Sequence, residues 1–192
     1  MSKIMHKEIQ TIDNGTILEH YFAFPNKDTK HLPTILLFHA WSGRDHLICE
    51  KANELASLGY LAVAVDLYGK NIIGNSTVEN QKLMQPFIND RNFLRNRLKL
   101  VFKEIIEVQP VQPNNMIGIG YCFGGLCVLD AVRNDFGLKA AISVHGKYDR
   151  PKYKSKEKYP AKTLILHGIK DTIAPFQKLL YLKNEFSKDA SI

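Results

Sequence analysis

The chain has 192 residues, of which 45% are hydrophobic and 23% charged. This composition is that of a globular protein and excludes disordered, collagen-like and disulfide-scaffold classes. Lys and Arg (26) outnumber Asp and Glu (19), and residues 147–162 alone carry seven basic and two acidic side chains. Because the excess is concentrated in one Lys/Tyr/Pro-rich stretch, we interpret it as a solvated loop, with contact to an anionic substrate or polymer as the alternative.

Signals for secretion, membrane insertion and metal binding are absent from the sequence. The first ten residues lack the apolar run of a signal peptide, and no apolar stretch approaches the roughly 18 residues that cross a bilayer. Cys49, Cys122 and Cys127 have neither a disulfide framework nor zinc-ligand spacing. We therefore expect one cytoplasmic domain over residues 1–192 that binds no membrane, nucleic acid or metal.

Buried strands alternate with amphipathic helices along the chain. Residues 7–24 alternate around Asp13-Asn14-Gly15, which predicts an opening hairpin. Short apolar runs typical of fully buried strands follow at 34–38, 61–65, 116–120, 140–144 and 163–166. Helical periodicity lies between them, around 48–55, 94–108 and 123–131, and again at 176–191, with Arg91, Arg95, Arg97 and Lys103 mostly on a solvated face. This order predicts an α/β domain whose mostly parallel central sheet has helices on both faces, with the ligand site at the carboxyl ends of the strands.

The segment from Gly118 to Gly125 carries the clearest chemical signal. A dinucleotide fingerprint would need glycine where Phe123 stands, so that interpretation fails on spacing. Gly120, Cys122 and Gly124 instead fit a nucleophile on a tight strand-to-helix turn, where glycines permit close backbone approach. We expect the helix N-terminus to lower the pKa of the thiol below the ~8.5 of free cysteine, and the Phe123 N–H to form half of an oxyanion hole. The alternative is a buried core thiol, which we expect for Cys49 and Cys127.

Together with residues 65–69 (Val-Asp-Leu-Tyr-Gly) and the loop around Asp171, the segment from Gly120 to Gly125 resembles the dienelactone hydrolase family, a branch of the α/β-hydrolase fold. The resemblance runs from about residue 15 to the end. It implies a hydrolase of lactones, carboxylic esters or related activated acyl groups, with a Cys, Asp, His triad in that chain order and neither metal nor organic cofactor. We expect a small-molecule ester or lactone as its partner, and a monomer or weak homodimer.

By the same resemblance Asp171 matches the triad acid, which orients a histidine and stabilises its cation. It could instead cap a helix that begins near Pro175, and Asp66, which also ends a strand, is the second choice for the acid.

The resemblance assigns the second oxyanion donor to the Trp41 N–H, in the loop after the strand at 34–38. Ala40 stands where the best-known members have a glutamate close to the thiol. Without that carboxylate, the sequence specifies neither how the thiol is activated nor whether the substrate is a dienelactone. Trp41, Tyr68 and Tyr121 either line an aromatic pocket or pack in the core.

The base of the triad is the missing element. Residues 172–192 contain no histidine, so we expect the catalytic histidine beyond residue 192. His145 and His167 each end a strand and border the pocket, His145 as a wall residue rather than as the base. The fold's last strand, histidine loop and final helix are also expected to be missing, which would leave the 192-residue chain inactive. The alternative function is a catalytically silent α/β-hydrolase-fold protein that binds a small anionic ligand or a protein partner.

Overall fold

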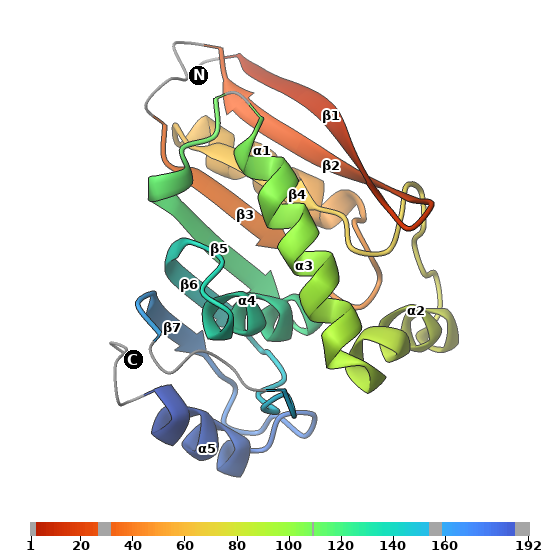
Figure 1. Cartoon of the computed structure of the whole chain (residues 1–192), viewed down its shortest axis with the longest axis vertical. Coiled ribbons are helices and arrows are strands. Elements are labelled where there is room, and N and C mark those ends of the chain that lie inside the picture. Colours follow the sequence, from red (N-terminus) through yellow and green to blue (C-terminus); the bar gives the residue numbers. More distant parts are fainter. Residues whose placement is uncertain (1–2, 27–31, 109, 154–158, 187–192) are drawn as a thin grey trace.

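The computed structural model describes residues 3–26, 32–108, 110–153 and 159–186, and its described strands form one seven-stranded sheet of order β1-β2-β4-β3-β5-β6-β7 (Figure 1). The sheet opens with the predicted hairpin of β1 (Ile4–Asp13) and β2 (Thr16–Pro25). Asn14 and Gly15 form its turn with φ of +48° and +84°, as a two-residue hairpin loop requires. β2 then pairs antiparallel with β4 (Leu61–Val65).

The remaining strands are parallel and run in spatial order from β4 through β3 (Thr34–Phe38), β5 (Met116–Tyr121) and β6 (Leu138–Val144) to β7 (Lys162–Leu166). Every residue of β3 and β4 is buried because helices cover both faces of the sheet. The predicted fold class is therefore confirmed, and all five predicted strands are present within two residues of their expected ends. The prediction of full burial is wrong for β7, where Leu164 and Leu166 are 49% and 48% exposed.

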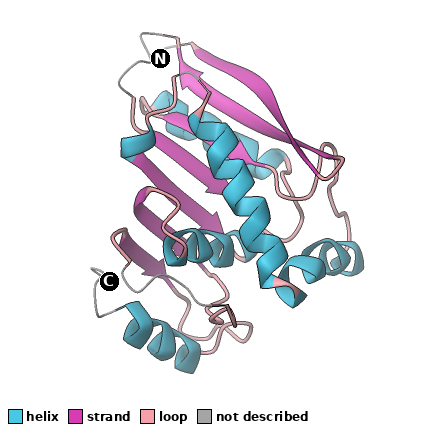
Figure 2. Cartoon of the chain, in the orientation of Figure 1, coloured by secondary structure: helices cyan, strands magenta, loops and turns pink. Residues whose placement is uncertain are grey.

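Helix α1 (His46–Ser57) covers one face of the sheet, where its buried side chains pack against the odd-numbered residues of β3. Helices α3 (Arg91–Ile106) and α4 (Phe123–Arg133) cover the other, and Figure 2 shows both lying across the front of the sheet. Helix α5 (Phe176–Phe186) joins the same core through Leu182 and Phe186. Of the sequence features predicted there, residues 187–191 of the last helix and residues 154–158 of the basic loop lie outside the described part.

Helix α2 (Thr77–Asn89) was not predicted from the sequence. The Ser76 side chain caps its start by accepting from the Glu79 N–H at 3.2 Å, and the Glu79 carboxylate accepts from the Asn75 N–H at 2.7 Å. The sequence signal for this helix is the Ser-x-x-Glu capping pattern. A single 3₁₀ turn, Pro113–Asn115, precedes β5.

The prediction that Arg97 lies on a solvated face of its helix is wrong. Its side chain is buried, forms an ion pair with Asp13 at the hairpin turn and donates to the Leu67 carbonyl at 2.7 Å. These partners come from β1 and from the loop after β4, so Arg97 ties the hairpin to the helical layer. A helical pattern cannot reveal partners so distant along the chain.

Candidate active site

Cys122 lies at the turn between β5 and α4, with φ +53° and ψ −108°. This left-handed conformation is unfavourable for a side-chain-bearing residue and recurs at functional sites. Two backbone hydrogen bonds hold it, from the Cys122 N–H to the Val144 carbonyl at 2.9 Å and from the Gly125 N–H to the Cys122 carbonyl at 3.0 Å. The thiol is thereby presented at the carboxyl edge of the sheet and at the N-terminus of a helix.

The flanking glycines are sterically required. A Cβ on Gly120 would lie 2.0 Å from the Gly124 carbonyl oxygen, and one on Gly124 would lie 2.1 Å from the Phe38 carbonyl oxygen. The first turn of α4 therefore packs directly on the backbones of β5 and of the residues that end β3, the close approach expected of a nucleophile turn.

The pKa of the Cys122 thiol differs from the sequence expectation. Burial of the half-buried sulfur raises its pKa, while a hydrogen bond from the Phe123 N–H and the Lys147 charge act in the opposite direction without overcoming burial. The expected lowering by the helix N-terminus is thus wrong in sign, because the sequence does not show how far the sulfur is removed from water. Such a thiol needs a base to become a thiolate at neutral pH.

The two expected oxyanion donors come from neighbouring segments. The Phe123 N–H acts on the Cys122 sulfur as a donor that lowers the pKa of the thiol. The Trp41 carbonyl accepts from the Tyr68 hydroxyl at 3.2 Å, and the Tyr68 ring stacks on the Phe123 ring with centroids 5.8 Å apart. The Trp41 N–H donates to none of the described residues. Tyr68 therefore braces the Trp41 loop against the start of α4.

Asp171 follows β7 and is held by its own loop. One carboxylate oxygen, Oδ1, accepts from the Ile173 N–H at 2.8 Å and from the Ala174 N–H at 3.0 Å. The Ala174 hydrogen bond is the main cause that lowers the pKa of Asp171, so the group stays a carboxylate. Oδ1 thus fixes the loop before α5 and not the first turn of that helix, which begins at Phe176, so Asp171 does not cap the helix as the alternative held. Oδ2 remains for another partner.

That partner is His145. Its Nδ1 lies 2.5 Å from Asp171 Oδ2. The two atoms meet at ion-pair distance without the alignment of a regular hydrogen bond, and Oδ2 has no other polar partner among the described residues. The carboxylate is 3% exposed and the imidazole 46% exposed. The sequence analysis missed this pair; its signal was a histidine directly after a buried strand.

The four residues predicted to form the substrate pocket lie around the turn in different settings. Ala40 is half-buried, Tyr68 is buried in the core, and Tyr121 is half-buried in the cluster on the α1 face. His145 is exposed. That they form one pocket stays a prediction.

A pocket of about 350 Å³ lies between the α2–α3 junction, α4 and the loop after β6, and none of those four residues lines it. Its cationic lining residues are Arg91, Lys147, Arg150 and Lys152.

The two remaining cysteines and the second candidate for the acid, Asp66, have structural settings. Cys127 is fully buried in α4, and burial raises its pKa well above the ordinary value. Cys49 is half-buried in α1, where burial raises its pKa too. Asp66 is 1% exposed and accepts three backbone N–H bonds, from Glu19, Tyr68 and Gly69. This arrangement fixes the loop after β4, so the structure does not support Asp66 as the acid.

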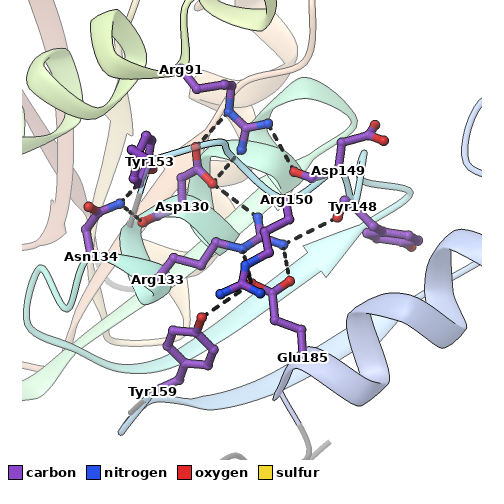
Figure 3. Close-up of polar contacts among 10 residues, drawn as sticks. All are labelled: Arg91, Asp130, Arg133, Asn134, Tyr148, Asp149, Arg150, Tyr153, Tyr159 and Glu185. Carbon is purple, nitrogen blue, oxygen red and sulfur yellow. Dashed lines mark hydrogen bonds and ion pairs between the residues drawn. The ribbon is translucent and has the colours of Figure 1, made fainter. Parts of the chain in front are cut away.

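A buried network of charges supports the loop that follows His145 (Figure 3). Asp130 in α4 binds Arg91 of α3 and Arg133 of α4, and Arg133 also pairs with Glu185 of α5. The two arginines then donate to the loop carbonyls, Arg133 to Tyr148 at 3.3 Å and Arg91 to Asp149 at 3.1 Å. Three helices thereby fix the backbone beside the candidate site.

Within the described residues, no three His, Cys, Asp or Glu side chains gather as metal ligands, and no helix is both long and apolar enough to cross a membrane.

An open, mostly parallel sheet with helices on both faces and a strained strand-to-helix turn after β5 is the architecture of the α/β-hydrolase fold. Solved structures share this fold. The chain is similar to a protein named m3DLH (TM-score 0.90, 22% identity, 97% of this chain and 78% of that one). It is also similar to a dienelactone hydrolase-like promiscuous phosphotriesterase from metagenomic libraries (TM-score 0.86, 22% identity, 97% of this chain and 77% of that one). A third similar structure is an acylaminoacyl peptidase of Pyrococcus horikoshii (TM-score 0.71, 15% identity, 100% of this chain and 37% of that one).

The chain belongs to the dienelactone hydrolase family, whose model matches residues 18–191. This confirms the family resemblance. Among curated proteins, an uncharacterized protein of Caenorhabditis elegans is 40% identical over 60 residues, which are 30% of this chain and 38% of the relative.

Proposed function

We propose that this hydrolase-family protein cleaves carboxylic esters or lactones with Cys122 as its nucleophile. The observation that carries the proposal is the turn at Cys122, where a left-handed backbone and two sterically required glycines hold a thiol against the Phe123 N–H. No structural need of a core cysteine accounts for this strain.

In the proposed reaction the Cys122 sulfur attacks the acyl carbon, and a C–S bond forms. The carbonyl electron pair moves to oxygen, where the N–H groups of Phe123 and Trp41 bind the oxyanion. Collapse of this intermediate breaks the C–O bond of the ester or lactone, and water then releases the acid from the thioester. Asp171 orients the histidine that carries the proton in both steps. Neither metal nor organic cofactor takes part in this scheme, and a cytoplasmic location and a monomer or weak homodimer belong to the same proposal.

The test compares Cys122→Ala with the unchanged protein on 4-nitrophenyl acetate and a panel of lactones. We expect Cys122→Ala to lose turnover by at least about a hundredfold, because no other described group stands at the nucleophile turn. Cys49→Ala is the matched control, since Cys49 is also half-buried but lies in α1, and it should keep the rate. Equal turnover by Cys122→Ala would refute the proposal.

A second readout separates catalysis from the alternative of a silent anion-binding protein. Iodoacetamide labelling followed by peptide mass spectrometry measures the reactivity of each thiol. We expect Cys122 to be labelled fastest at neutral pH. A thiol at position 122 that reacts no faster than Cys127, in a protein that binds carboxylates or phosphate without turnover, would favour the alternative.

A further inference from the structure

We propose that the buried His39 is a positioning residue that fixes the direction of the second oxyanion donor, the Trp41 N–H. The inference rests on the proposed function, in which the N–H groups of Phe123 and Trp41 bind the oxyanion. His39 directly follows β3 and begins the loop that carries Trp41, and its side chain is fully buried. Its role follows from the partners of its two ring nitrogens.

The ring nitrogens of His39 bond to backbone groups from two different loops. Nδ1 lies 2.6 Å from the Ala40 carbonyl oxygen, and Nε2 lies 3.3 Å from the Leu67 backbone nitrogen. A carbonyl oxygen can only accept and an N–H can only donate, so Nδ1 carries the proton and Nε2 accepts. Burial also lowers the pKa of His39, which favours the neutral ring. The two backbone partners therefore fix one tautomer from both sides.

The bond to the Ala40 carbonyl determines where the Trp41 N–H points. In a trans peptide the C=O and the following N–H lie in one plane and point in opposite directions. The Ala40 carbonyl accepts from His39 Nδ1–H and, at 3.3 Å, from the Gly43 N–H. The Trp41 N–H is therefore directed away from the buried ring, and it donates to none of the described residues. A donor held in place without a partner suits an oxyanion that forms only during the reaction.

The loop after β4 is a rigid anchor for this arrangement. The Leu67 carbonyl accepts from Arg97 at 2.7 Å, and the Asp66 carboxylate accepts from the next two N–H groups along the loop, each at 2.9 Å. The Leu67 N–H that bonds to Nε2 thus belongs to a segment fixed by buried charges. His39 connects this segment to the Trp41 loop, which forms only a turn.

The ring of His39 also packs beside the residues that accompany both donors. It meets the Tyr68 ring edge-on with centroids 4.7 Å apart, and the Phe123 ring lies at 6.1 Å. Tyr68 in turn donates to the Trp41 carbonyl at 3.2 Å. The two carbonyls on either side of the Trp41 N–H are therefore held by neighbouring buried rings, one of which is His39.

This role is separate from proton transfer. Both nitrogens of His39 are occupied by backbone groups and the ring is closed to solvent, so it neither reaches a substrate nor exchanges its proton during turnover. Its loss should slow the steps that build negative charge on the carbonyl oxygen and leave the reactivity of the Cys122 thiol unchanged.

The test compares two amide substitutions at position 39. The amide nitrogen of asparagine lies where Nδ1 stands and can donate to the Ala40 carbonyl, whereas the longer glutamine places its oxygen where Nε2 stands and can accept from Leu67. With 4-nitrophenyl acetate we expect kcat of His39→Gln to fall by about ten- to a hundredfold with little change in KM, and that of His39→Asn by less than about fivefold. Equal losses in the two variants would overturn the assignment, as would full activity in both.

Labelling of Cys122 by iodoacetamide separates the positioning role from a general disturbance of the site. Alkylation displaces iodide and forms no oxyanion, so His39→Gln should label Cys122 within about twofold of the rate of the unchanged protein. A fall in labelling that parallels the fall in kcat would show that the substitution disturbs the nucleophile turn, and would overturn the assignment.

His20→Asn is the matched control. His20 is also fully buried and accepts from the loop after β4, at the Asp66 N–H, but its second nitrogen faces Thr11 of β1. We expect the folded His20→Asn protein to keep both kcat and labelling. A loss of kcat as large as that of His39→Gln would mean that any substitution of a buried histidine has this effect, and would also overturn the assignment.

The outcomes separate this inference from the proposed function. Full turnover in Cys122→Ala would overturn the proposed function itself, whereas loss of turnover in Cys122→Ala with full turnover in His39→Gln would overturn the role of His39 alone. The ¹³C′ chemical shift of Ala40 reports the hydrogen bond to its carbonyl without any turnover, and it should move in His39→Gln more than in His39→Asn. Should the variants fail to fold, ring ¹⁵N shifts of His39 in the unchanged protein must show the neutral Nδ1–H tautomer at neutral pH, and any other form would refute the contact.

Discussion

Two buried carboxylates near the carboxyl edge of the sheet have different partners. Asp130 in α4 meets Arg91 at 2.5 Å and Arg133 at 3.1 Å, whereas Asp171 after β7 meets His145 at 2.5 Å. Arginine stays charged at every pH at which the protein is folded, but imidazole gains and loses its proton near neutrality. The Asp130 group therefore joins helices through charges that stay fixed, whereas Asp171 pairs with a residue type that general acid–base catalysis uses.

Exposure separates the two groups further. Arg133 is fully buried and forms a two-point contact with Glu185 at 3.0 and 2.8 Å, which leaves no approach for a substrate. The ring of His145 is 46% exposed. The first group is closed to solvent and the imidazole of the second is open to it, although both are ion pairs.

The largest effect should come from Asp171→Asn. The amide keeps the Oδ1 contacts with Ile173 and Ala174 but no longer stabilises an imidazolium, so kcat should fall by about a thousandfold. The free energy of unfolding, measured in urea, should change by less than about 1.5 kcal/mol because the loop's hydrogen bonds survive. Unchanged kcat would place Asp171 with Asp130 among the structural carboxylates.

The fold was largely predictable because burial on both faces leaves a simple trace in the sequence. The run at 61–65 reads as a fully apolar strand, and the structure places it inside the sheet, between β2 and β3. Helix α2 was missed because its buried residues are few and its capping signal, Ser76 with Glu79, lies in a polar stretch. Arg97 was misassigned because its partner Asp13 is 84 residues away along the chain.

The sequence predicted single residues of the candidate site, each at the end of a strand, but not the contacts between them. Cys122 and Asp171 each carry a local motif, but the contact between His145 and Asp171 depends on the side-by-side position of β6 and β7. The sign of the thiol pKa was not predictable, because it depends on how deeply the surrounding chain buries the sulfur.

The next prediction tests the buried ion pairs that join Asp130, Arg133 and Glu185. Arg133→Met should lower the free energy of unfolding by about 3–5 kcal/mol, because Glu185 and Asp130 stay buried with fewer cations around them. The folded fraction should retain its thiol reactivity, since Arg133 reaches the site only through the Tyr148 carbonyl. Urea denaturation and Cys122 labelling measured on the same sample separate these effects. A stable variant with an unreactive Cys122 would reverse the assignment of the two groups.

A smaller effect concerns His20, which also lies beside an acid, Asp66, but is buried where His145 is exposed. Its ring is fully buried and accepts from the Asp66 N–H at 3.1 Å, and burial lowers the pKa of His20 to about 4 from an ordinary value of 6.5. The unfolded chain therefore binds a proton that the folded protein excludes. Stability from this group is fully present above pH 6.5 and is lost as the pH falls toward 4, by about 2 kcal/mol between pH 7 and pH 5.

His20→Gln removes this titration while leaving an amide to face Thr11, so its stability should fall less steeply with pH than that of the unchanged protein. The difference between the two urea midpoints at pH 7 and pH 5 isolates His20 from His39, whose pKa burial also lowers. Parallel pH curves would show that His20 is charged in the folded protein. In that case, burial beside a carboxylate would not be enough to keep a histidine neutral.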